Sequence, residues 1–207
     1  MARKAKPKSK PSSRDALIDA ALTLAATKDW AQLSLPAIAD EAGVPLAEAL
    51  GHFASKGAVL AGAFRRIDQA VLDGMPKQLD PEDTIRDRLF ELLMGRIDQL
   101  APHKAAVRNL LCGLRERPIA AFCHLPRLQC SMRLMLEAAG TDTSGLSGIL
   151  KTKGLIAVYL NALRVWLDDD SADMAPTMAA LDRGLMQAEK LAAGLWVIDR
   201  GDPKSES

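Results

Sequence analysis

Apolar residues recur every three or four positions along most of the chain, which is the spacing of one buried face on an α-helix. Leu, Ala and Met supply most of the apolar side chains, and the scarcity of aromatic residues also favours helices over strands. The pattern predicts helices over residues 13–27, 35–42, 45–53, 56–74, 81–100, 102–117, 119–139, 148–168 and 174–200. Pro126 should interrupt the seventh of these. We therefore predict an all-α protein of about nine helices.

Residues that start and stop helices separate a small N-terminal module from the rest of the chain. Ser34 is placed to cap the second helix, and Gly43 is placed to end it. The Met75–Pro76 and Asp80–Pro81 pairs then break the chain after the fourth helix. The predicted parts are a flexible arm (1–14), a small helical head (15–75), a larger helical domain (76–200) and a polar tail (201–207).

The last two predicted helices carry more apolar surface than one neighbour can cover. Residues 148–168 are apolar around most of the helix circumference. In residues 174–200, apolar side chains repeat at alternating spacings of four and three, which is typical of a helix that packs along another helix. We expect a homodimer through these two helices, with burial of both faces inside one subunit as the alternative.

Charge is distributed unevenly between the arm and the body of the chain. Residues 1–14 hold six cations and no acid, a net charge of +6, whereas residues 15–207 hold 21 bases against 26 acids, a net charge of −5. The arm is either a nucleic-acid contact or a solvated tail. The chain has no apolar signal segment and no stretch long enough to be an integral membrane segment. Three cysteines without CxxC spacing suit a reducing compartment, so we expect a cytoplasmic protein.

No catalytic, metal or cofactor motif is present in the sequence. The three histidines lie in different predicted helices, and none has the spacing of a helical zinc site. The acidic run 168–173 lacks the glycine and terminal glutamate of a calcium loop. We therefore predict that it ends one helix and caps the next. Glycine-rich phosphate loops and the GxSxG elbow are also missing. We predict no enzymatic activity, no metal and no cofactor.

Residues 38–44 (Ile-Ala-Asp-Glu-Ala-Gly-Val), followed by residues 52–56 (His-Phe-Ala-Ser-Lys) and Leu60, resemble the helix-turn-helix signature of the TetR family of dimeric, ligand-responsive repressors. The resemblance covers about residues 14–64 and implies a TetR-like fold: a three-helix head that binds DNA and a larger domain for ligand binding and dimerisation. Residues 44–53 would enter the major groove, and Ser34 and Lys56 would meet phosphates. The candidate DNA-binding residues are Arg3, Lys4, Lys6, Ser34, Pro45, Leu46, His52 and Lys56.

The surface expected to touch DNA departs from that family's pattern. Leu50 stands where the family usually has tyrosine, and Glu48 adds a negative charge. Residues 15–64 carry two lysines against six acids, a balance of −4, so this module alone should bind DNA poorly. The basic arm could supply the missing phosphate or minor-groove contacts.

A second resemblance covers about residues 98–188. Residues 100–106, 140–144, 157–160, 166–173, 177–178 and 181–183 look like the ubiquinone-biosynthesis accessory family. Trp30 is similar to that family's usual residue at the end of the first helix. Members of that family share the TetR fold, bind lipids, partner a hydroxylase and do not act as repressors. The family's further C-terminal amphipathic membrane helix is not found in this sequence.

The two resemblances imply the same fold but different functions. The first hypothesis is a DNA-binding repressor that responds to an apolar small molecule. The alternative is an accessory protein that binds a lipid or isoprenoid and no DNA. Either ligand would lie among the helices of the larger domain. The candidate ligand-binding residues are Met94, Leu111, Phe122, Met132, Met135, Tyr159 and Trp166. The alternative is plain core, which is the more common role of helically spaced Met and aromatic residues.

Overall fold

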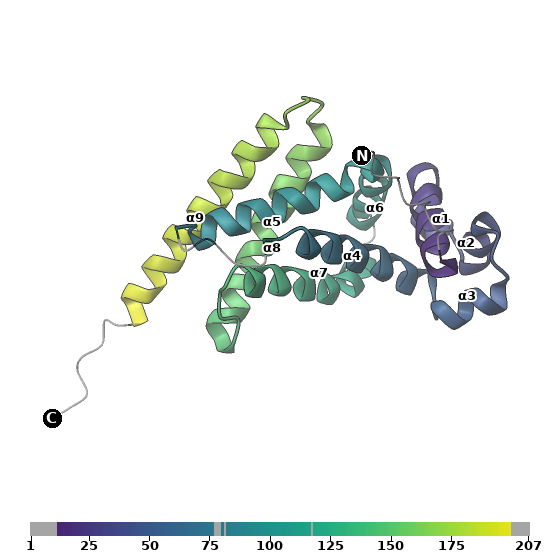
Figure 1. Cartoon of the computed structure of the whole chain (residues 1–207), viewed down its shortest axis with the longest axis horizontal. Coiled ribbons are helices and arrows are strands. Elements are labelled where there is room, and N and C mark those ends of the chain that lie inside the picture. Colours follow the sequence, from purple (N-terminus) through teal and green to yellow (C-terminus); the bar gives the residue numbers. More distant parts are fainter. Residues whose placement is uncertain (1–11, 77–79, 81, 117, 200–207) are drawn as a thin grey trace, which may run out of the picture. The chain divides into compact units, whose positions relative to one another are not determined.

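The computed structural model describes residues 12–76, 80, 82–116 and 118–199, and all regular structure in these ranges is helical (Figure 1). The all-α prediction is confirmed. The helices are α1 (Ser13–Thr27), α2 (Leu35–Ala42), α3 (Leu46–His52), α4 (Lys56–Asp73), α5 (Ile85–Leu100), α6 (Lys104–Glu116), α7 (Pro118–Ala138), α8 (Gly145–Asp168) and α9 (Ala175–Asp199). Two short 3-10 turns, η1 (Trp30–Gln32) and η2 (Ala101–His103), precede α2 and α6.

Three helices differ from the sequence prediction. Helix α5 begins at Ile85 and not at residue 81, because Thr84 and Asp87 form a capping box that starts the helix there. Pro126 lies inside α7, which continues through it, so the expected interruption was wrong. A proline costs a helix one N–H donor, and here that loss does not end the helix. Helix α8 begins at Gly145 and not at residue 148, because a left-handed backbone at Gly145 (φ 61°) lets the chain turn directly into the helix.

The helices pack into two compact units. Unit 1 contains residues up to 66 together with 103–116, and unit 2 contains residues 67–102 together with those from 117 onwards. The boundary falls inside α4, which is one continuous helix. Packing therefore groups α6 with the N-terminal helices, whereas the predicted domain limits at residues 75 and 76 follow only the order of the sequence and stay a prediction.

Unit 1 is built on α1, whose buried face carries Leu17, Ile18 and Leu24. Its core continues through Ile38 on α2 and Phe53 after α3. Helix α6 packs on α1 through Ala106 and Leu110. The Asn109 side chain donates hydrogen bonds of 3.1 and 2.9 Å to the carbonyls of Ala25 and Ala26, which lie in the last turn of α1. Those carbonyls have no partner within the helix, so α6 also caps α1.

Unit 2 encloses a buried polar network. Arg96 on α5 is 2% exposed and pairs with Asp68 on α4. The same guanidinium donates to the hydroxyls of Ser131 on α7 and Tyr159 on α8, the latter at 3.0 Å. Ser131 in turn donates to Asp68 at 3.0 Å. One arginine thus connects four helices, and its burial is tolerated because a carboxylate and two hydroxyls satisfy it.

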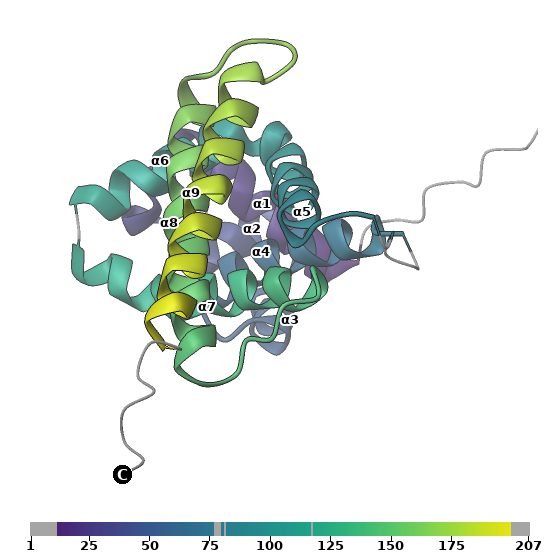
Figure 2. The same ribbon diagram turned by 90° about the vertical axis from the view of Figure 1, so that its left-hand side faces the viewer.

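Helices α8 and α9 lie side by side in unit 2 (Figure 2). Gly184 on α9 allows this close approach, because a Cβ there would lie 2.8 Å from Cγ1 of Val158. The turn between the helices is held by Asp169, whose carboxylate accepts hydrogen bonds from the backbone and hydroxyl of both Ser171 and Thr177. These bonds, chiefly those from the two hydroxyls, lower the pKa of Asp169 to about 2. Within the described ranges no helix is both long and apolar enough to cross a membrane.

Candidate nucleic-acid interface

Helices α2 and α3 form the turn predicted from the sequence. The Ser34 hydroxyl accepts a hydrogen bond of 3.3 Å from the backbone N–H of Ala37, which caps α2. Gly43 ends the helix with φ 64°, a left-handed conformation that favours glycine. Pro45 then starts α3, and Ala49 and Phe53 anchor this helix in the core of unit 1. The local geometry of a helix-turn-helix is therefore present.

The outward face of α3 is apolar and acidic. Leu46 and Leu50 are 42% and 52% exposed. Glu48 and His52 are also exposed, with 3.9 Å between the Glu48 carboxylate and His52 Nε2. Residues 46–52 contain no Arg, Lys, Asn or Gln, which are the residue types that make bidentate hydrogen bonds to purines.

The structure gives Lys56 a role inside the head that sequence reasoning missed. Its ammonium donates to the carbonyls of Trp30 (2.9 Å), Ala31 (2.9 Å) and Leu33 (2.6 Å). It also lies 5.9 Å from the centroid of the Trp30 ring. An ammonium has three N–H donors, so these carbonyls match its full capacity. A phosphate contact by Lys56, which was expected, would compete with these bonds.

Two other cations of unit 1, Arg66 and Arg14, are also engaged. Arg66 on α4 pairs with Asp19 at 2.6 Å and lies 3.7 Å from Asp15, both on α1. The guanidinium of Arg14 lies 5.3 Å from the centroid of the Phe53 ring. Arg3, Lys4 and Lys6, which were predicted to contact DNA, lie outside the described residues.

The predicted ligand-binding residues are divided between the two units. Met132, Met135, Tyr159 and Trp166 are buried in unit 2, and Tyr159 belongs to the Arg96 network. Met94 is half-buried in the same unit, whereas Leu111 belongs to unit 1. The side chain of Phe122 lies outside the described residues.

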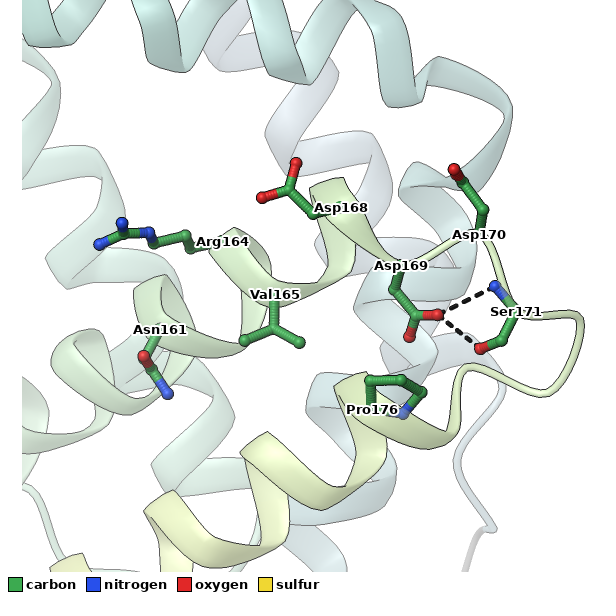
Figure 3. Close-up of a pocket in the computed structure, with 8 residues that line it drawn as sticks. All are labelled: Asn161, Arg164, Val165, Asp168, Asp169, Asp170, Ser171 and Pro176. Carbon is green, nitrogen blue, oxygen red and sulfur yellow. Dashed lines mark hydrogen bonds between the residues drawn. The ribbon is translucent and has the colours of Figure 1, made fainter.

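The depression shown in Figure 3 is open, and six of the eight residues that line it are polar. It is lined by the end of α8, the following turn and Pro176 at the start of α9: Asn161, Arg164, Val165, Asp168, Asp169, Asp170, Ser171 and Pro176. Asp169 points to Ser171 and is held by it, so this carboxylate already has partners. In the part of the chain that the structure describes, no three His, Cys, Asp or Glu side chains are placed to hold a metal ion.

Comparisons with known proteins relate the chain to bacterial regulators. Residues 17–63 match the family model described as "Bacterial regulatory proteins, tetR family". A TetR transcriptional regulator from Nitrosomonas europaea is 25% identical, with a TM-score of 0.67 over 87% of this chain and 99% of that one. A TetR transcriptional regulator from Rhodococcus sp. RHA1 is 19% identical, with a TM-score of 0.59 over 85% and 97% of the two chains. A TetR-family regulator from Streptomyces coelicolor is 18% identical, with a TM-score of 0.58 over 90% and 84%.

No curated protein matches the sequence. The chain has the fold of TetR transcriptional regulators, as the resemblance of its head implied, and the head carries that family's N-terminal helix-turn-helix sequence.

Proposed function

We propose that the protein is a dimeric transcriptional regulator that binds operator DNA through α3 and releases it when an apolar molecule binds. The observation that carries this proposal is the intact turn of α2, Gly43 and α3, within the segment that matches the family model. Because residues 15–64 carry a net charge of −4 and Lys56 is held by backbone carbonyls, the affinity for phosphates would come largely from the arm, with Arg3, Lys4 and Lys6 among its six cations.

The proposed homodimer forms through α8 and α9. Among the side chains of these helices that the structure describes, six large apolar ones are exposed, and a partner would remove them from water. They are Leu146, Ile149, Leu150, Leu160, Met178 and Leu191. A second copy would cover these side chains. The dimer would then carry two heads, one for each half-site of the operator DNA.

The proposed effector is an apolar small molecule held among the helices of unit 2. Met132, Met135, Tyr159 and Trp166 are buried there, so the effector would enter by displacing packed helices. Helix α4 belongs to both units and carries Asp68 of the buried network. A ligand that moved this part of α4 would therefore act on the same helix that holds Lys56 in the head.

DNA binding to the region upstream of the protein's own gene tests this proposal. Fluorescence anisotropy would compare that duplex with a scrambled duplex over a range of salt concentrations. A regulator gives a sequence-dependent complex that weakens with salt. Removal of residues 1–14 should lower the slope of log affinity against log salt by about 0.9 for each phosphate that the arm neutralises. Equal affinity for both duplexes would refute the proposal.

A second candidate is an accessory protein that binds lipid and not DNA, as the resemblance of residues 98–188 suggests. It is supported by the engagement of Lys56 with three carbonyls and by the apolar and acidic face of α3. This candidate predicts no DNA complex above that of the scrambled duplex. It also predicts lipid in organic extracts of the purified protein, detected by mass spectrometry.

A further inference from the structure

Two leucines give the outward surface of α3 an apolar edge. Leu46 and Leu50 are 42% and 52% exposed, and no other large apolar side chain is exposed in the described part of unit 1. They are separated by one helical turn, so they lie next to each other on the same side of α3. Two adjacent leucines in water are a cost unless a partner covers them.

The rest of the α3 surface shows how closely a partner can approach. With about 100° between successive residues, Ala47 and Gly51 lie at the centre of the outward face. A Cβ added at Gly51 would meet nothing within 4 Å, so space remains in front of it. The leucines border this small-residue centre on one side, and Glu48 with His52 borders it on the other. The small side chains at the centre of this face allow close approach to a groove. The apolar edge suits a groove whose floor carries methyl groups.

We infer that α3 recognises its operator by contact between Leu46 and Leu50 and the C5-methyl groups of thymines. This inference rests on the proposed function and specifies which bases the head reads. Leucine can neither donate nor accept a hydrogen bond, and the thymine methyl is the apolar group that the major groove displays. DNA is favoured over a protein partner because both leucines lie on the second helix of a helix-turn-helix, which is the helix that enters the groove.

Replacement of thymine by uracil tests the inference, because it removes the methyl group and nothing else. Duplexes are first selected by the full-length protein from a random library long enough for two half-sites. Each thymine of a selected duplex is then replaced in turn. Burial of one methyl group corresponds to about a fourfold change in affinity, so each contacted thymine should show a loss of that size. Uncontacted thymines in the same duplex are the internal control.

Variants then connect the methyl groups to the leucines. Leu46→Ala and Leu50→Ala should bind the thymine and uracil duplexes with nearly equal affinity. Leu50→Met, which retains a large apolar side chain, should keep the preference for thymine. Circular dichroism of each variant checks that the head is folded, and Ala is a good helix former at these exposed positions.

Each other outcome has a defined meaning. If the selected duplex binds equally well with uracil at every position, the thymine inference is wrong and the regulator remains. If both alanine variants bind the thymine duplex as the parent does, α3 does not read bases, and the leucines are left for a protein partner. If no duplex is selected above random DNA, the proposed function fails and this inference fails with it.

Discussion

Replacement of Lys56 by methionine separates a structural role of this residue from a DNA-binding role. The ammonium donates to the carbonyls of Trp30, Ala31 and Leu33, and the bonds to Trp30 and Leu33 are partly buried. Methionine keeps an unbranched apolar side chain of similar length but has no N–H donor. The substitution therefore removes the hydrogen bonds while it preserves most of the packing.

The size of the effect follows from the number and exposure of these bonds. A hydrogen bond that involves a charged group contributes about 1.5–3 kcal/mol net. Water can replace the ammonium at the exposed Ala31 carbonyl, so two bonds count, and partial exposure reduces each to the lower end of that range. We expect Lys56→Met to lower the free energy of unfolding by about 3 kcal/mol. For a chain of this size that lowers Tm by about 6–12 °C.

Urea unfolding followed by circular dichroism measures this loss, with Lys28→Met as the matched control. Lys28 is exposed in the same unit, so its replacement should change stability by less than about 0.5 kcal/mol. If Lys56 instead served phosphates, Lys56→Met would unfold as the parent does and would reduce the salt dependence of DNA binding. Equal stability of the two variants would therefore refute the structural assignment of Lys56.

Three further predictions concern other parts of the molecule. The pKa of Asp169 is about 2 when folded, below its ordinary value of 3.8, so its stabilising contribution is complete above about pH 4 and is lost as the pH falls toward 2. Asp169→Asn should lower Tm at pH 7 and flatten the acid part of a Tm-against-pH curve; an unchanged curve would contradict this. Gly62→Ala would place a Cβ 2.8 Å from Cε1 of Phe53, and it should cost about 1–3 kcal/mol in urea unfolding. Glu48→Gln removes a negative charge from α3, so it should raise DNA affinity about threefold in low salt and less at about 0.15 M, where charges are screened. An affinity that stays constant would place Glu48 away from the phosphates.

The helices could be predicted well because the signals for each helix lie in residues that are close together in the sequence. Ser34 and Gly43 were expected to start and stop the second helix, and the structure places both in those roles. The periodicity of apolar residues likewise predicted α1 and α2 with the bounds that the structure has. These features depend on the preferences of the chain within one or two helical turns.

Contacts between distant residues could not be predicted in the same way. Lys56 and the carbonyls that it binds are separated by 23 to 26 residues, and nothing in the sequence marks a backbone carbonyl as available. Arg96 and Asp68 were not singled out either, because a single charge within an amphipathic helix usually faces solvent. A polar residue on the apolar side of α5 was the available signal, since Arg96 follows Leu92 and Leu93 at helical spacing.

The pairing of α6 with α1 has a consequence for work on fragments. A polypeptide that stopped at residue 75 would leave Ala25 and Leu60 without their neighbours Ala106 and Leu110. It would also lack the amide of Asn109 at the end of α1. Weak folding of such a truncated piece would then result from the absence of α6 and not from a defect in the helix-turn-helix. Joining residues 103–116 back to the N-terminal segment through a short glycine-rich linker should restore an independently soluble piece.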